Sequence, residues 1–396
     1  ESFLHTVFGT IQCVHELSTH YEGVMMKHAR VGVIGTIAVT ALALAACGGG
    51  SSSEPSASAP AASAPAASAP AESASSLPDL SGQSFTFAGF GGALQENQTK
   101  AWFDPFSAAT GVTINQTDNT GAAALQTQID AGNVQWDVVE DAQFFTDLEC
   151  GKLFEKIPDV DRSQIDPKFL TNECGVPIIK FSFILGYNKD KYPNGPAGIG
   201  DFVNVKDFPG KRAASSSAVN GVIEAALLGS GVPADQLYPL DVDKAITVLD
   251  GIKGDIVFKE TFAEIQDGLA SGEFDMALLP NGRAYNASVA NPSITATWGD
   301  ALTLWDNAVI PVGAPNQEAA KAFLNYIATA DTQKALSSIF PYGVLTAGEP
   351  PVLSDALMPF FPDNPANLES LLFQDQKWWA ENNDATSQKW TAFLSG

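Results

Sequence analysis

Histidine and cysteine are the side chains that most often carry acid–base, nucleophilic and metal chemistry, and their positions here exclude much of it. All four histidines, His5, His15, His20 and His28, precede Cys47, which ends a segment with the pattern of an export signal. The chain that follows Cys47 therefore contains no histidine. Ser-His and Cys-His mechanisms are excluded there and the commonest metal ligand is missing, so we expect no metal, no cofactor and no enzymatic activity.

Two cysteines remain once Cys13 and Cys47 are set aside, Cys150 and Cys174. An exported protein folds in an oxidising compartment, where an isolated pair of this kind forms a disulfide. A closed loop of about 25 residues stabilises the fold by about 3 kcal/mol on the loop-entropy model. We predict this disulfide.

Carboxylates are plentiful, and two of them end a predicted strand. Glu140 and Asp141 end the predicted strand that begins at Trp136, and adjacent strand positions face opposite sides, so we expect at most one of them to contact a ligand. A glycine-rich turn, 89–92, follows the first strand and either exposes backbone N–H groups or closes a tight strand-to-helix connection. It is not a dinucleotide fingerprint, because the third glycine would fall at Leu94.

Two runs of alternating strands and helices position these residues. The first run predicts strands 84–88, 112–116 and 136–140 around helices 95–109 and 122–131. The second predicts strands 212–215, 255–259 and 274–279 with helices 221–229, 243–252 and 262–270. Such alternation forms parallel sheets with right-handed crossovers.

Long apolar segments, 176–188 and 302–312, connect the two runs. Helices 317–328 and 332–338 should return to the first lobe. The predicted fold class is therefore α/β, a two-lobed clamshell with lobe 1 at 80–187 plus 307–396 and lobe 2 at 188–306. Ligands of open α/β sheets bind beyond the carboxyl ends of strands, so the cleft between the lobes is the expected site.

The segment before the lobes has the organisation of a lipoprotein precursor. Residues 1–24 precede the plausible start methionines and are taken as a leader outside the fold. Residues 25–46 have a basic start, an apolar core too short to span a membrane, and small residues before Cys47. Leu44-Ala-Ala-Cys47 resembles a bacterial lipobox, so we expect lipidation of Cys47. Residues 47–79, rich in Ala, Ser and Pro, predict a disordered linker.

The charge balance restricts the partners. A formal charge of −24 repels nucleic acid phosphates and is compatible with a cationic ligand. Solubility of an exported protein explains the same charge equally well.

Several motifs together resemble one family. Their order along the chain is similar to that of the spermidine/putrescine-type periplasmic binding proteins of ABC importers, whose fold is a type II-like clamshell and whose members deliver ligand to a permease. The motifs are Asn172-Glu-Cys-Gly-Val176, Leu185-Gly-Tyr-Asn-Lys-Asp190, Asp207-Phe-Pro-Gly-Lys-Arg212, Asn281-Gly-Arg283 and Phe340-Pro-Tyr-Gly-Val344.

The resemblance implies some site residues and departs at others. Polyamine-binding members hold an amine with an aspartate at the position of Asp306, and Tyr342 matches a ligand-contacting position. The acidic residues expected near 217–222 are missing, and a helix N-terminus there, capped by Ser216 and Ser217, would favour an anionic group instead.

Arg283 follows Asn-Gly in one branch of the family, and its guanidinium suits a carboxylate or phosphonate. An ordinary salt bridge is the alternative role for Arg283, and a solvated turn is the alternative for Asp306. Together the two residues would suit a zwitterion, such as a short ω-amino acid, better than a polycation. The candidate ligand-binding residues are Gly89, Phe90, Gly91, Gln95, Glu140, Asp141, Ser216, Asn220, Arg283, Tyr285, Asp306 and Tyr342.

The predicted function is an extracytoplasmic, lipid-anchored, monomeric receptor for a small amine or amino-acid-like ligand, working with an ABC permease. A carboxylate-dependent secreted hydrolase or lyase, a receptor for another solute such as an aminophosphonate, and a purely structural surface lipoprotein remain alternatives. Iron is excluded by the lack of histidine and of adjacent tyrosines. For Trp378 and Trp379, at the start of a last amphipathic helix, we expect core packing.

Overall fold

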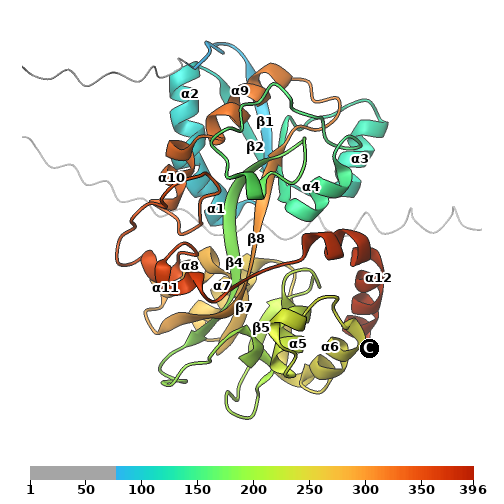
Figure 1. The fold of residues 1–396 in the computed structure, drawn as a ribbon, viewed down its shortest axis with the longest axis vertical. Coiled ribbons are helices and arrows are strands. Elements are labelled where there is room, and N and C mark those ends of the chain that lie inside the picture. The colour runs from blue at the N-terminus through green and yellow to red at the C-terminus, as the bar shows by residue number, and fades with distance from the viewer. Residues whose placement is uncertain (1–76) are drawn as a thin grey trace, which may run out of the picture. The chain divides into compact units, whose positions relative to one another are not determined.

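The computed structural model describes residues 77–396. The predicted leader, the lipoprotein signal, Cys47 and the linker up to residue 76 lie outside the described residues. The remaining chain has two halves, one above the other in Figure 1, joined by long strands. It has the two-lobed fold expected from the sequence.

The first lobe is built around three parallel strands, β1 (Ser84–Gly89), β2 (Thr113–Asp118) and β3 (Val138–Ala142). A nearly continuous helical segment follows β1, and it comprises α1 (Gly92–Gln98), a π-helical turn (Thr99–Phe103) and α2 (Asp104–Thr110). The other helices of this lobe are α3 (Ala122–Asp130), α4 (Gln143–Glu149), α9 (Gln317–Ile327) and α10 (Ala330–Ser337). Buried aromatic rings, among them Phe85, Phe103 and Phe323, pack between β1 and these helices.

The second lobe repeats the arrangement with β5 (Arg212–Ser215), β6 (Ile256–Lys259) and β7 (Met276–Pro280), again parallel to one another. Its helices are α5 (Val222–Gly229), α6 (Val242–Asp250), α7 (Phe262–Ser271) and α8 (Asn281–Ala290). A capping box in which Thr261 and Glu264 bond reciprocally starts α7.

Three strands cross between the lobes. The long strands β4 (Val176–Asn188) and β8 (Ile294–Val309) pair antiparallel along most of their length, and β9 (Leu371–Phe373) adds to β8 in parallel. Strand β8 also pairs with β3, and β4 pairs with β7, so β4 and β8 join the parallel strands of the two lobes through antiparallel ladders. The sheet order is therefore β2-β1-β3-β8-β4-β7-β5-β6.

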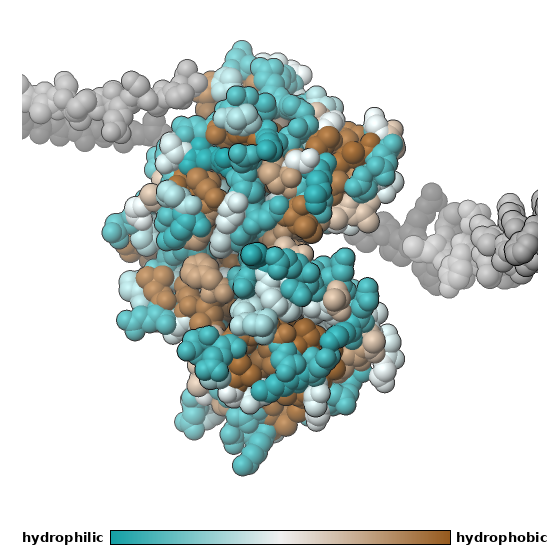
Figure 2. Space-filling model, turned by 45° about the vertical axis from the view of Figure 1, so that its right-hand side comes forward, coloured by the Kyte–Doolittle hydropathy of each residue, from teal (hydrophilic) through white to brown (hydrophobic). Residues whose placement is uncertain are grey.

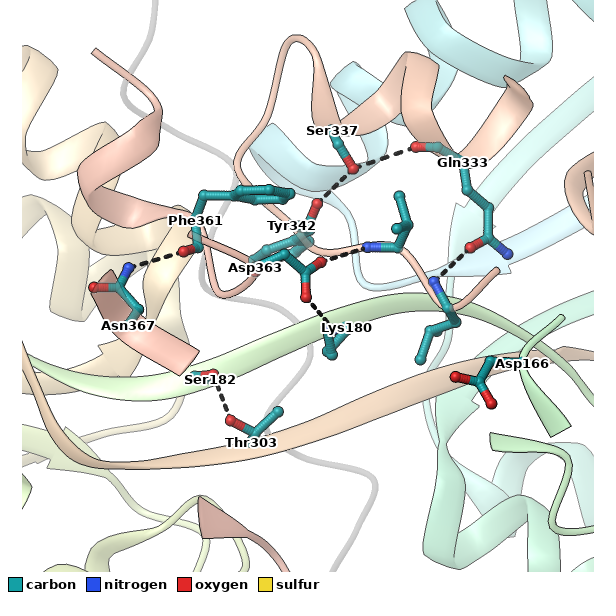
Figure 3. Close-up of polar contacts among 12 residues, drawn as sticks. Asp166, Lys180, Ser182, Thr303, Gln333, Ser337, Tyr342, Phe361, Asp363 and Asn367 are labelled. Carbon is teal, nitrogen blue, oxygen red and sulfur yellow. Dashed lines mark hydrogen bonds and ion pairs between the residues drawn. The ribbon is translucent and has the colours of Figure 1, made fainter. Parts of the chain in front are cut away.

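Polar contacts hold the middle of the crossings. Figure 3 shows Ser182 of β4 beside Thr303 of β8, with hydroxyl oxygens 2.8 Å apart. Lys180 forms a buried ion pair with Asp363, whose second oxygen accepts the Val344 N–H at 3.1 Å. The segment 340–363 is thereby fastened along the free edge of β4, opposite β8.

The C-terminal segment contains α11 (Pro365–Leu368) and α12 (Gln376–Ser395). The sequence led us to place all of 307–396 with lobe 1, and the lobe boundaries stay a prediction. In the structure Trp379, Trp390 and Phe393 of α12 instead join the core cluster of lobe 2. The Trp379 indole also donates to the buried Glu224 of α5 at 2.9 Å. Core packing is confirmed for Trp379, which is fully buried.

The disulfide prediction is confirmed. Cys150 and Cys174 are bonded, with Cα atoms 5.6 Å apart, and they tie the end of α4 to the segment before β4. Within residues 77–396 no helix has the length and apolar character needed to cross a membrane. On the face shown in Figure 2, hydrophobic patches are interrupted by hydrophilic side chains on both lobes.

Candidate ligand-binding site

The pairing of β3 with β8 brings three carboxylates together. In this antiparallel ladder Ala142 lies opposite Asp306 and Glu140 lies opposite Ala308. Asp306 and Glu140 are almost completely buried, and Asp141 is half-buried. We call Glu140, Asp141 and Asp306 the acidic cluster. Among residues 77–396 none of the three forms an ion pair with a lysine or arginine.

Glu140 is held by one amide. Gln98 Nε2, at the end of α1, donates to both carboxylate oxygens of Glu140 at 3.0 and 2.9 Å. The pKa of Glu140 is raised to about 7. Burial is the largest cause, the charge of Asp141 acts in the same direction, and the hydrogen bonds from Gln98 act against both. Glu140 therefore changes its charge close to neutral pH.

The other two carboxylates also favour the protonated form. Burial raises the pKa of Asp141 to about 6, against the lowering effect of hydrogen bonds from Asn119 and the Ala142 N–H. The pKa of Asp306 is raised well above its ordinary value, first by burial and then by the charges of Glu140 and Asp141. A cation brought into this cluster would stabilise the ionised forms of all three.

Arg283 approaches from the second lobe. It lies in the first turn of α8, and a Cβ atom added to Gly92 of the first lobe would be only 3.2 Å from an Arg283 guanidinium nitrogen. Within the described residues Arg283 has no ion-pair partner. The salt bridge considered as its alternative role is therefore not present in this part of the chain.

Buried Asn281 sets the position of α8. Its Oδ1 atom accepts the Ser182 N–H at 2.9 Å, and its Nδ2 atom donates to the carbonyls of Pro341 and Phe360 at 2.6 and 2.8 Å. The helix start is thus fastened both to β4 and to the segment that carries Tyr342. No side chain caps the N-terminal N–H groups of α8.

Tyr342 is influenced by charges of both signs. Burial raises the pKa of its phenol; the positive charge of Arg283 acts against this, and the charges of Asp306 and Glu140 add to it. Its ring packs against Phe340 with centroids 4.8 Å apart, and both rings lie against Gly282, where a Cβ atom would be within 2.5 Å of Phe340 and 2.8 Å of Tyr342. Only glycine at 282 allows this contact.

One backbone N–H group of the glycine-rich turn after β1 is already hydrogen-bonded to the helix that follows. The Gly91 N–H donates to Gln95 Oε1 at 2.9 Å, and Gln95 Nε2 donates to Gln116 at 3.1 Å. Of the two roles proposed for the turn, this bond supports the tight connection at Gly91. Gly91 and Gln95 line a cavity of about 610 Å³ on the first lobe, while Phe90 is half exposed beside them. Gly89 packs against Glu140, since a Cβ atom there would be 3.3 Å from Oε2.

The remaining candidates make contacts within the second lobe. The expected capping by Ser216 and Ser217 is wrong, because α5 begins only at Val222 and Gly221, in the left-handed conformation, precedes it. Asn220 Nδ2 donates to Ser215 Oγ at 2.8 Å, and the Ser216 carbonyl accepts the Trp390 indole N–H at 2.6 Å. These contacts leave a ligand role for Ser216 and Asn220 as a prediction.

Tyr285 packs against Phe360 with ring centroids 5.8 Å apart. Two residues along a helix turn the side chain by about 200°, so Tyr285 faces away from Arg283. Its ligand role also stays a prediction.

Sequence patterns did not reveal the amides that support the site. Gln98 bonds to the Glu140 carboxylate, and Asn119 Nδ2 reaches the Glu140 carbonyl and an Asp141 oxygen at 3.0 and 3.1 Å, whereas Asn281 bonds to backbone groups that hold α8 in place. Gln98 had a detectable signal, since it occupies one position of the otherwise apolar series Leu94, Trp102 and Phe106, four residues apart. A polar residue in such a series indicates a buried partner.

Comparison with known proteins agrees with this geometry. Residues 101–368 match the family model described as bacterial extracellular solute-binding protein. A gamma-aminobutyric acid-binding protein of Pseudomonas aeruginosa is 31% identical over 324 residues, which is 79% of this chain and 91% of that protein.

Two solved structures are similar over nearly their whole length. One is the periplasmic binding protein AgtB of A. tumefaciens R10 in complex with agropinic acid, at 32% identity and TM-score 0.71, covering 79% of this chain and 99% of AgtB. The other is an ABC transporter substrate-binding protein from Bradyrhizobium japonicum USDA 110, with the same identity, TM-score and coverage. With its two lobes, its crossing strands and this similarity, the chain belongs to the bacterial extracellular solute-binding protein family.

Proposed function

We propose that the chain is the receptor of an ABC importer and captures a zwitterionic ω-amino acid, such as γ-aminobutyric acid, between its lobes. The ammonium group would lie at the acidic cluster and the carboxylate at Arg283. The observation that carries this proposal is the presence of opposite charges, Arg283 and the acidic cluster, each without an ion-pair partner among residues 77–396 and both acting on the phenol of Tyr342.

Energetics support a ligand with two charged ends. A buried charge is costly unless it is paired and hydrogen-bonded. An ammonium group would compensate the ionised cluster, and a carboxylate would form a bidentate pair with the Arg283 guanidinium. The uncapped N-terminus of α8, a helix of 10 residues, adds a favourable field for an anion at the same place.

The relatives support the same ligand class. One relative is named for γ-aminobutyric acid, and the AgtB structure holds agropinic acid. A polyamine remains the second candidate, because three carboxylates exceed what one ammonium group requires. The relatives are solute-binding proteins, which favours a receptor over the hydrolase alternative.

Binding measurements separate the two ligands. We expect γ-aminobutyric acid and 5-aminovalerate to raise the melting temperature and to give saturable calorimetric isotherms, while putrescine binds more weakly. Removal of one partner of a buried charge pair costs about 2 kcal/mol or more, so Arg283→Ala and Asp306→Asn should each weaken binding by about 30-fold or more.

Matched controls are available on the surface. Lys189→Ala and Asp355→Asn remove exposed charges and should leave the affinity unchanged. If putrescine binds more tightly than the amino acids and Arg283→Ala has no effect, the ligand is a polyamine and the zwitterion proposal is wrong.

The location of the protein is part of the proposal. Membership of an extracellular solute-binding family agrees with an extracytoplasmic site of action. We further propose that Cys47 carries the lipid that keeps the receptor beside its permease, with the Ala/Ser/Pro segment as the tether.

A further inference from the structure

Helix α12 is fixed to the second lobe but begins beside the first. Near its end, the Trp390 indole donates to the Ser216 carbonyl at 2.6 Å, and Lys389 pairs with Asp243 of α6 at 2.7 Å. Its first residue is Gln376. Figure 1 shows α12 at the side of the lower lobe and α4 of the first lobe above it. The start of α12 is therefore the part of this helix that reaches both lobes.

Gln376 joins α12 to the start of α4. Its Oε1 atom accepts the Phe144 N–H at 3.1 Å, and Phe144 is the second residue of α4. The first N–H groups of a helix have no partner within the helix, and Ala142, which precedes α4, has no side-chain acceptor for them. The Phe144 ring also packs against the core cluster of the second lobe. A side chain fixed to the second lobe thus holds a helix start of the first.

The start of α4 adjoins the acidic cluster. Strand β3 ends at Ala142 and α4 begins at Gln143, so no loop separates them. Ala142 lies opposite Asp306 in the ladder with β8. The next residue of β8, Asn307, donates from Nδ2 to Thr146 Oγ1 of α4 at 2.6 Å, and both side chains are buried. Helix α4 is therefore attached to both strands that carry the cluster, and a shift of its start moves the carboxylates.

Buried amides continue this contact into the second lobe. Gln376 Nε2 donates to Gln374 Oε1 at 2.6 Å, and Gln374 Nε2 donates to the Val219 carbonyl and to Glu224 at 2.8 and 3.1 Å. Gln376 and Gln374 are 5% and 4% exposed. Each amide uses both its N–H and its C=O group. Neither amide turns to follow a different position of α4 without losing a hydrogen bond, which is costly in a buried place.

The contact between α4 and α12 coexists with the approach of the lobes at the ligand site. In the same structure the Arg283 guanidinium of the second lobe lies beside Gly92 of the first. A contact that is formed in this arrangement and lost when the lobes separate stabilises the closed form. It also increases the fraction of ligand-free protein that is ready to bind.

We propose that Gln376 is a positioning residue of the receptor. It holds the start of α4 against α12 while the lobes are closed, and it thereby keeps Glu140 and Asp141 where they receive the ammonium group. It acts through Phe144 and α4, and not by contact with the ligand. This role rests on the amino acid receptor function proposed above and assigns part of the affinity to a contact outside the acidic cluster and Arg283.

The test replaces Gln376 by methionine in the full chain, with the same tether in every variant. Gln376→Met keeps the length of the side chain and removes its amide. We expect γ-aminobutyric acid to bind about fivefold more weakly or worse, mainly through faster dissociation, which calorimetry and stopped-flow kinetics measure. X-ray scattering should give a larger radius of gyration for the ligand-free variant than for the ligand-free parent. Saturating ligand should remove this difference.

Matched controls lie on the same two helices. Gln388→Met replaces an exposed glutamine of α12 and should leave the affinity and the radius of gyration unchanged. Phe144→Ala keeps the N–H group and removes the ring from the core of the second lobe, so it should open the lobes as Gln376→Met does. Leu148→Ala, a change of an exposed apolar residue of α4, should not. Circular dichroism verifies that each variant is folded.

The scattering comparison of the ligand-free proteins is independent of the ligand's identity. A larger radius in Gln376→Met, together with no binding of γ-aminobutyric acid by the parent, would support the positioning role and reject the amino acid proposal. An unchanged radius and an unchanged affinity in both Gln376→Met and Phe144→Ala would overturn the positioning role. Tighter binding in either variant would overturn it as well, because the contact would then favour the open form.

Discussion

Gln98 occupies a position that a helix facing a core normally gives to an apolar residue. Its amide holds both oxygens of Glu140, so a neutral side chain, and no cation, supports the most buried carboxylate of the cluster. A carboxylate supported in this way is poised between its two protonation states, with a pKa of about 7. Glu140 therefore becomes fully ionised, as an ammonium ligand requires, only when the ligand binds or the pH rises.

The pH dependence of stability follows from Glu140. Its pKa rises from 4.5 to about 7 on folding, so the folded state binds more protons between these values. The stabilising contribution is present in full below pH 4.5 and is lost as the pH rises to 7. We expect the ligand-free protein to melt at a lower temperature at pH 8 than at pH 5, and Glu140→Gln to show a smaller decrease. Equal decreases in both proteins would assign the effect to other groups.

Ligand binding should show the complementary proton release. An ammonium group favours ionised Glu140 and Asp141, so binding near pH 6.5 should release protons and become tighter as the pH increases. Calorimetry in buffers of different ionisation enthalpy measures this release directly. Absence of proton release, with binding intact, would place the ammonium group away from the cluster.

The sequence alone identifies some of these residues and not others. Asp306 and Arg283 follow from the family resemblance, and the structure places both near Tyr342. Gln98 and Asn119 were missed because an amide in a helix or after a strand has no distinctive spacing. Their roles depend on contacts with β3, since Gln98 bonds to Glu140 42 residues later and Asn119 to the Glu140 carbonyl 21 residues later, and no local pattern reveals these contacts.

At the scale of elements, the strands were easiest to predict and the connections hardest. Strands β4 and β5 have the bounds predicted, because each is a continuous buried run between polar or glycine-rich segments. Helix α8 was missed, since Asn281-Gly282 reads as a turn and becomes a helix start only through the contacts of Asn281. The first half of β8 was missed because Gly299 and Asp300, the latter with φ 55°, interrupt its pattern.

The crossing elements depend on the buried pair Lys180–Asp363, whose side chains are 10% and 8% exposed. Lys180→Ala should destabilise the protein by about 3–5 kcal/mol, because it leaves Asp363 buried without a counter-charge. The double variant Lys180→Met/Asp363→Leu should recover most of that loss in urea denaturation. A double variant as unstable as the single one would mean that the lost hydrogen bond to Val344 dominates.

The disulfide gives a second prediction for these elements. Cys150 and Cys174 are separated by 24 residues, so the paired replacement by serine should lower the free energy of unfolding by about 3 kcal/mol. Denaturation with and without reductant measures the difference. The reduced parent should match the paired variant, and a parent insensitive to reductant would contradict the prediction.

The whole molecule combines a receptor with a proposed membrane tether. If Cys47 is lipidated, Cys47→Ser should move the protein from the membrane fraction to the soluble extracytoplasmic fraction without changing ligand affinity. Fractionation with immunoblotting, and mass spectrometry of the anchor, measure the two outcomes. A parent protein recovered without lipid would overturn the tether.

The order in which the chain is made has a consequence for its folding. The core of lobe 1 brings Phe85 and Phe87 against Phe323, so its first strand waits for residues synthesised more than 230 positions later. Contacts this distant in sequence form slowly. A chain emerging from the ribosome therefore cannot complete the core of lobe 1 until residue 323 has been translated. The division of lobe 1 between two distant parts of the chain thus makes its core late to form, whereas the strands β5, β6 and β7 of lobe 2 come from one continuous segment.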